Sequence, residues 1–132
     1  MRNKIIDKTM GKCAYCGECI KGSATVDHII PKSIFDHTVF YKVGIPYFLT
    51  HLVVGQAENE DNLFAACKTC NEYKSDFSIE VFRGLISKSL HRLQSKSIEY
   101  RVAKRFGLLQ EKQAVKIEFF FEKLFSEKTN ED

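Results

Sequence analysis

The chain has 132 residues, 44% of them hydrophobic and 28% charged, and its formal net charge is +3. This composition excludes a chain that is disordered throughout, and the length predicts one domain, residues 1–132. No run of about 18 apolar residues that could cross a membrane is present. Residues 1–7 also lack the apolar stretch of a secretion signal, so we expect a cytoplasmic protein.

The N-terminal part of the chain predicts a lead-in, a compact turn and a strand. Residues 1–12 form the lead-in, and Gly17 within residues 13–19 permits a tight backbone turn. Residues 24–30 favour β structure and are predicted to form a strand that stops at Pro31.

The middle of the chain contains a long segment between two predicted strands. Residues 33–59 are apolar and aromatic, and they include three residues that interrupt regular secondary structure, Gly44, Pro46 and Gly55. Because an unstructured loop of this length is unusual in a compact domain, we interpret the segment as an insertion with some ordered structure. Residues 62–66 are a candidate for the second short strand.

The following residues have helical patterns. Residues 68–76 are polar and are predicted to form a helix. Ser78 is a suitable N-cap for a longer helix. The apolar residues of that helix recur at helical spacing, at Phe82, Leu85, Ile86, Leu90 and Leu93. A further helix is expected near residues 97–106, and Gly107 is suited to end it.

Residues 115–121 alternate at first between apolar and charged side chains, which predicts a strand. A helix is the alternative, because Ile117, Phe121 and Leu124 share one helical face. Residues 77–125 are therefore expected to form a mainly helical extension with one possible strand. The fold class predicted for the whole chain is α+β.

The five cysteines lie in two groups, Cys13, Cys16 and Cys19, and then Cys67 and Cys70. Each group contains a CxxC pair, and in a reducing compartment such pairs bind metal more often than they form disulfides. Zn²⁺ prefers four tetrahedral ligands, so the two CxxC pairs are predicted to hold one structural zinc ion. Buried free thiols and a redox-active pair are the alternatives. Cys19 could replace Cys16 as a ligand, but we expect it to be an ordinary small apolar residue.

Four motifs, two of which include the cysteine pairs, contain the candidate catalytic and metal-binding residues. Taken alone, His28 would more often be a structural histidine than a catalytic one. However, CxYCG, DHIIPKS, NL and CxxCN, the last followed by Lys74, occur in this order. The string resembles the HNH endonuclease family over residues 10–76, apart from residues 33–59. This resemblance implies a small ββα-metal fold, in which a β-hairpin and a helix hold one catalytic metal ion.

The resemblance also implies roles for individual residues. His28 matches the general base that deprotonates the attacking water, and Asp27 matches a metal ligand. Asn62 matches the asparagine that fixes the loop between the two strands. Asn71 stands where the family often has its last histidine, and it would be the second metal ligand.

The chemistry of these residues agrees with phosphodiester hydrolysis. A neutral histidine can accept a proton from water near neutral pH. The oxygen ligands Asp27 and Asn71 suit Mg²⁺ or Mn²⁺ better than zinc. Because side chains alternate along a strand, Asp27 and His28 should face opposite sides unless the strand ends or bends there.

Positive charge is concentrated in the second half of the chain. Residues 83–123 contain ten Lys or Arg and four Glu. We expect the DNA contacts to include Lys74, Arg83, Arg92 and Arg105. The alternative is that these side chains are simply solvated on helix surfaces. The remaining histidines are expected to be surface or packing residues, and these are His37, His51 and His91.

The leading interpretation is a metal-dependent DNA endonuclease with DNA as its partner. A non-catalytic, zinc-stabilised DNA-binding module is the alternative, and an RNA nuclease would need the same site chemistry. A homodimer is plausible, because aromatic residues of the insertion would suit an interface. Those residues are Phe40, Tyr41, Tyr47 and Phe48.

Overall fold

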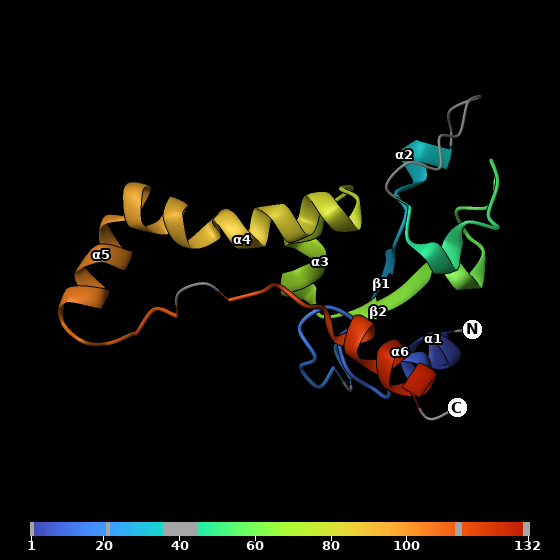
Figure 1. Cartoon of the computed structure of the whole chain (residues 1–132), viewed down its shortest axis with the longest axis horizontal. Coiled ribbons are helices and arrows are strands. Elements are labelled where there is room, and N and C mark those ends of the chain that lie inside the picture. Colours follow the sequence, from blue (N-terminus) through green and yellow to red (C-terminus); the bar gives the residue numbers. More distant parts are fainter. Residues whose placement is uncertain (1, 21, 36–44, 113–114, 131–132) are drawn as a thin grey trace.

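The computed structural model describes residues 2–20, 22–35, 45–112 and 115–130 as an α+β fold (Figure 1). The strands are β1 (Thr25–His28) and β2 (Leu63–Ala66). The α-helices are α1 (Arg2–Lys8), α2 (Lys32–Phe35), α3 (Lys68–Lys74), α4 (Ile79–Lys96), α5 (Ile98–Arg105) and α6 (Phe120–Asn130). Two 3₁₀ turns, Tyr47–Leu49 and Glu60–Asn62, lie between α2 and β2.

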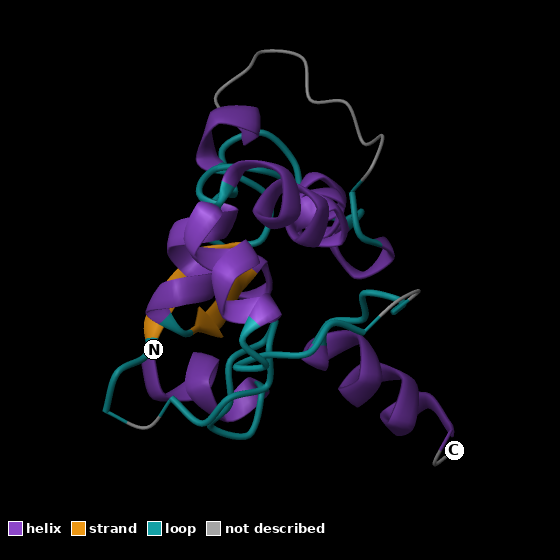
Figure 2. Ribbon diagram, turned by 90° about the vertical axis from the view of Figure 1, so that its left-hand side faces the viewer, coloured by secondary structure: helices purple, strands orange, loops and turns teal. Residues whose placement is uncertain are grey.

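The two strands form an antiparallel pair in which Thr25 lies opposite Ala66 and His28 lies opposite Leu63. Helix α3 starts directly after β2 and packs against β1. Figure 2 shows the strands side by side, with helices on either side of them. The predicted strands at residues 24–30 and 62–66 are thus confirmed, and each is shorter than expected.

Helices α4 and α5 begin where the sequence predicts them to begin. The Ser78 hydroxyl accepts a hydrogen bond from the Val81 amide at 3.3 Å, and the Ser97 hydroxyl accepts one from the Tyr100 amide at 3.1 Å. Each bond satisfies an amide that has no partner within the first turn of its helix. The two helices form an arm that extends away from the strands (Figure 1).

The core is built from aromatic rings around Tyr15. Its ring contacts Phe82 and Phe119 edge to face, with centroids 5.3 and 5.4 Å apart. Phe64 of β2 and Phe121 of α6 complete the contacts of that ring at 6.2 and 6.3 Å. Rings from four separate parts of the chain therefore hold β2, α4 and α6 together.

The predicted strand at residues 115–121 is wrong. Residues 115–119 have no regular structure, and α6 starts at Phe120. The amides of Phe120 and Phe121 donate to the carbonyls of Tyr15 and Ala14, at 3.0 and 2.8 Å. The segment therefore binds a turn near the N-terminus, and core packing rather than a partner strand fixes Phe119 and Phe121.

The aromatic residues of the insertion do not form one exposed group. Tyr47 is 76% exposed, but Phe48 packs against Phe64, Phe121 and Phe125. Phe48 is half-buried and its ring packs on the core, so it is not one of the exposed aromatic residues. Phe40 and Tyr41 lie outside the described residues.

Within the described part of the chain, no helix combines the length and apolar character needed to cross a membrane. The longest helix, α4, carries both charged and apolar residues along its length.

Candidate functional site

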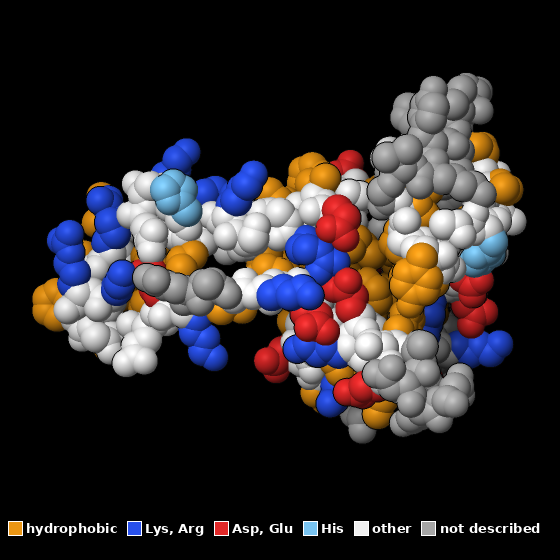
Figure 3. Space-filling view, viewed as in Figure 1, with side chains coloured by type: hydrophobic (Ala, Val, Ile, Leu, Met, Phe, Trp, Pro, Cys, Tyr) orange, Lys and Arg blue, Asp and Glu red, His pale blue; other side chains and the backbone are white. Residues whose placement is uncertain are grey.

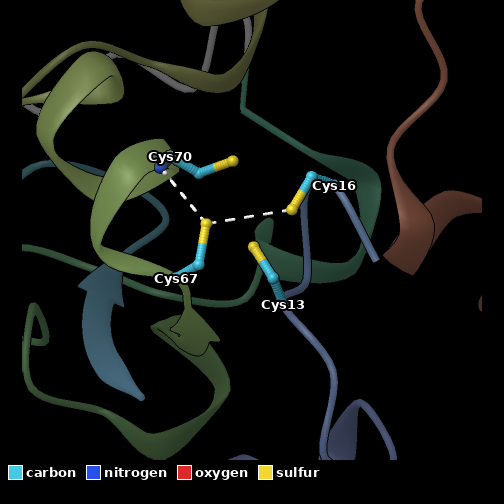
Figure 4. Close-up of side chains that lie close together, drawn as sticks. All are labelled: Cys13, Cys16, Cys67 and Cys70. Atoms are coloured by element: carbon cyan, nitrogen blue, oxygen red, sulfur yellow. Dashed lines mark hydrogen bonds between the residues drawn. The ribbon is translucent and has the colours of Figure 1, made fainter. Parts of the chain in front are cut away.

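Four cysteines from two distant parts of the chain form one cluster (Figure 4). The sulfur atoms of Cys13, Cys16, Cys67 and Cys70 all lie within 4.8 Å of one another. The cluster joins the turn after α1 to the start of α3 and is consistent with a zinc site. Cys19 lies outside this cluster; it is exposed and forms a backbone bridge with Lys12.

Local backbone structure brings each pair of sulfur atoms together. The first pair lies in a tight turn, in which the Cys13 amide donates to the Glu18 carbonyl at 2.8 Å and Gly17 has φ +81°. The second pair lies at the N-terminus of α3, where the Cys67 sulfur accepts from the Cys70 amide at 3.3 Å. The Cys13 sulfur accepts from the Tyr15 amide at 3.4 Å. Such N–H donors stabilise negative charge on sulfur.

The thiols of Cys13, Cys16 and Cys70 do not ionise independently. A hydrogen bond from Cys70 lowers the pKa of Cys13 to about 4, and the same interaction raises the pKa of Cys70. Burial raises the pKa of Cys16 to about 11. Because negative charges so close together repel one another, a fully ionised cluster requires a compensating cation.

Asp27 and His28 of the DHIIP motif and Asn71 line one surface hollow of about 510 Å³. The hollow lies between the end of β1, the start of α2 and the end of α3. Strand β1 ends at His28, so Asp27 and His28 both border the hollow even though they are neighbours in a strand. The other lining residues are Val26, Pro31, Lys32, Ser33, Ser75 and Asp76.

His28 is paired with a carboxylate that sequence reasoning missed. Its Nε2 lies 2.8 Å from Oε1 of Glu58, which also pairs with Lys32 at 3.0 Å. Hydrogen bonds from Lys32 and His28 lower the pKa of Glu58. The only signal in the sequence was an acidic side chain four residues before Asn62, and nothing there connects it with His28.

Asp27 is buried and its Oδ2 has two partners. The Tyr15 hydroxyl donates to this oxygen, and the Lys74 ammonium lies 3.0 Å from it. Burial raises the pKa of Asp27, while the Lys74 charge and the Tyr15 hydrogen bond act in the opposite direction. Burial also raises the pKa of Tyr15 well above its ordinary value, so this hydroxyl stays a neutral donor.

Lys74 does not lie on the surface, contrary to its expected role as a DNA contact. Its side chain is 0% exposed, and Nζ donates to the His28 carbonyl at 3.0 Å as well as pairing with Asp27. A buried ammonium requires such partners. A phosphate therefore has no access to Lys74, and the residue links α3 to the end of β1.

Asn62 lies directly before β2, at the end of the 3₁₀ turn Glu60–Asn62. Its side chain is buried, its Oδ1 accepts from the Ile30 amide at 2.8 Å, and its Nδ2 donates to the carbonyls of Ile30 at 3.1 Å and Ala57 at 3.0 Å. Asn71 donates from Nδ2 to the Thr25 hydroxyl at 2.9 Å. Its amide oxygen is therefore the atom that it could offer to a cation.

The basic residues differ in their availability. Arg83 binds both oxygens of Glu122 at 2.8 Å and also pairs with Glu80, so its charge is already used within the protein. Arg92 donates to the Leu85 carbonyl at 2.6 Å and to the Tyr73 hydroxyl at 2.7 Å. Of the four predicted contacts, Arg105 at the end of α5 is the exposed one.

Lysine and arginine side chains are spread along the arm (Figure 3). His91 is exposed on α4, and His51 is exposed with Nε2 2.9 Å from Oδ2 of Asp61, as expected for surface histidines. His37 lies outside the described residues.

Among the described residues, the four cysteines are the only group of three or more Cys, His, Asp or Glu ligands close enough to share one ion. Asp27 and Asn71 are thus at most a partial ligand set, of the kind that Mg²⁺ completes with water and phosphate oxygens. Comparisons of the chain with protein-family models, curated proteins and solved structures find no match.

Proposed function

We propose that the cysteine cluster binds one structural Zn²⁺. Four thiol ligands from two CxxC turns form a closed set, which is typical of structural rather than catalytic zinc. The N–H donors to the Cys13 and Cys67 sulfurs support this proposal, because they favour the thiolate forms that zinc requires.

We further propose that the chain is a metal-dependent endonuclease that hydrolyses DNA phosphodiester bonds. The observation that carries this proposal is the hollow that Asp27, His28 and Asn71 share. These residues come from motifs more than forty positions apart, and a module that only binds DNA has no need to bring them together.

In the proposed reaction His28 accepts a proton from the attacking water. With Nε2 engaged by Glu58, the nitrogen available for this proton is Nδ1. Asp27 and Asn71 would hold Mg²⁺ or Mn²⁺ through oxygen atoms. The bound cation would supply positive charge for the phosphate and the leaving oxygen. Asn62 holds the loop that follows His28.

One observation favours the second candidate, a non-catalytic DNA-binding module. Asp27 is 4% exposed and its Oδ2 is already used by Tyr15 and Lys74. A carboxylate in this position can serve the fold alone. In that case the hollow would have no cation, and the zinc cluster and the basic arm would carry the whole function.

Cleavage of supercoiled plasmid DNA with Mg²⁺ or Mn²⁺ tests these proposals. We expect His28→Ala to lower the cleavage rate by about 10²- to 10⁴-fold, as for loss of a general base. His51→Ala is the matched control, because His51 also pairs with a carboxylate but lies outside the hollow. Both variants should retain about one zinc per chain.

The outcomes separate the candidates. Equal cleavage by wild type and His28→Ala would refute the role of His28. DNA binding without cleavage by zinc-loaded wild type would favour the binding module. Faster cleavage of single-stranded or duplex RNA than of DNA would make RNA the substrate and leave the proposed catalytic residues unchanged. Nicked or linear products would show whether one or two strands are cut, which bears on the expected homodimer.

A further inference from the structure

The two residues that bind Asp27 Oδ2 come from the two cysteine motifs. Tyr15 lies between Cys13 and Cys16, in the turn that carries the first pair of sulfurs. Lys74 lies in α3, one turn after Cys70. The cluster therefore fixes the backbone from which both donors reach the carboxylate.

Both donors are held firmly. Tyr15 is 3% exposed, and four aromatic rings surround its own ring, so its hydroxyl has little freedom to move. Lys74 is fully buried and is bound to two atoms of the site strand, the Asp27 carboxylate and the His28 carbonyl, each at 3.0 Å. Such a double attachment restricts a side chain that would otherwise have four rotatable bonds.

We propose that Tyr15 and Lys74 are positioning residues that hold one oxygen of Asp27, so that the other oxygen is presented to a divalent cation in the hollow; this inference rests on the proposed nuclease function. A carboxylate free to rotate would lose conformational entropy on binding a cation, whereas a held carboxylate has already lost it. Partners that orient a ligand in this way commonly contribute about 10- to 100-fold to metal affinity.

If Tyr15 and Lys74 position Asp27, the cysteine cluster has a second role. When zinc fixes the two cysteine motifs, it also fixes the donors to Asp27. Occupancy of the structural site is then linked to binding at the hollow, although none of the four cysteines lines that hollow.

Tyr15→Phe is the most direct test, because it removes the hydroxyl and keeps the ring in its aromatic cluster. Mn²⁺ alone is the probe, and its binding to zinc-loaded protein is followed by electron paramagnetic resonance of free Mn²⁺. We expect Tyr15→Phe to weaken Mn²⁺ binding by about tenfold or more, with zinc content unchanged. Tyr73→Phe is the matched control, because the Tyr73 hydroxyl binds Arg92 and not the hollow.

A second variant, Lys74→Met, removes the other donor and is expected to weaken Mn²⁺ binding in the same direction. In plasmid cleavage, both variants should need more Mn²⁺ for half-maximal rate, while the KM for DNA stays unchanged. If only one variant retains zinc, that variant decides the test. Loss of zinc from both would overturn the inference, because the residues would then support the fold rather than the carboxylate.

Asp27→Asn separates this inference from the proposed function. If Asp27→Asn abolishes Mn²⁺ binding and cleavage while zinc-loaded Tyr15→Phe and Lys74→Met bind Mn²⁺ as wild type does, the positioning roles are wrong and the nuclease proposal stands. If wild type binds no Mn²⁺ beyond its zinc and cleaves nothing, the proposed function fails, and the inference fails with it.

Discussion

Glu58 and His28 are separated by thirty residues, yet Oε1 and Nε2 lie 2.8 Å apart. A carboxylate that accepts a hydrogen bond from one ring N–H fixes both the orientation and the tautomer of a histidine. The Lys32 ammonium lies 3.0 Å from the same oxygen, Oε1 of Glu58. At the scale of single residues, Glu58 is therefore the expected orienting partner of the proposed base.

Glu58→Ala should slow single-turnover DNA cleavage by about 10- to 100-fold, because a misplaced base reacts poorly even when its chemistry is intact. Asp61→Ala is the control, since Asp61 forms the equivalent pair with the exposed His51. An equal decrease in rate in both variants would point to a general effect of surface charge and against an orienting role.

Asn62 makes three hydrogen bonds from a fully buried side chain. Asn62→Ala should lower the free energy of unfolding by about 2 to 4 kcal/mol, because it leaves buried backbone groups of Ile30 and Ala57 without partners. Urea unfolding of zinc-loaded protein measures this decrease. Asn59→Ala, which removes an exposed cap, should cost about 1 kcal/mol or less. A similarly small decrease in the free energy of unfolding for Asn62→Ala would contradict the structural role of Asn62.

Helix α5 has no buried residue. Its apolar side chains Ile98 and Val102 are exposed, as is Phe106 at its C-cap, and Arg101 and Arg105 lie near them. A helix with this surface adds little to the core. Its basic residues are better placed than Arg83, whose charge is paired with Glu122, to follow a DNA backbone.

The double variant Arg101→Glu, Arg105→Glu should weaken DNA binding and reduce the slope of log affinity against log salt by about 0.9 for each phosphate that the arm no longer neutralises. Fluorescence anisotropy with a labelled duplex at several salt concentrations measures both quantities. The double variant Lys4→Glu, Lys123→Glu, with exposed lysines on α1 and α6, controls for the same change in net charge away from the arm. An unchanged salt slope in the double variant would exclude the arm from the DNA-binding surface.

Sequence patterns predicted the elements whose causes are local. Ser78 and Ser97 start helices through their own hydroxyls, and the CxxC spacing by itself brings two sulfurs close. Patterns failed where packing between distant residues decides the structure. Phe119 and Phe121 pack on the ring of Tyr15 instead of forming a strand, and Lys74 pairs with the buried carboxylate of Asp27. Glu58 could not be predicted, because its pairing depends on how the insertion folds.

At the scale of the whole molecule, the cysteine cluster closes the chain between residues 13 and 70. Cys16→Ser should reduce bound zinc well below one per chain and lower the unfolding temperature, because a structural metal contributes its binding energy to folding. Cys19→Ser should retain the metal and the wild-type unfolding temperature, since Cys19 lies outside the cluster. Metal analysis measures the bound zinc, and thermal unfolding measures the unfolding temperature. Loss of zinc from Cys19→Ser would show that Cys19 is one of the zinc ligands.

The packing of residues 119–121 on the first cysteine turn has a consequence for biosynthesis. The amides of Phe120 and Phe121 bind the carbonyls of Tyr15 and Ala14, and Phe119 and Phe121 pack on the Tyr15 ring. On a translating ribosome these partners emerge more than a hundred residues after the turn that they cover. The aromatic core, and with it the surroundings of the Tyr15 hydroxyl that binds Asp27, is therefore completed only after residues 119–121 have emerged. We expect a nascent chain stalled before residue 115 to lack this core even after both cysteine pairs have emerged.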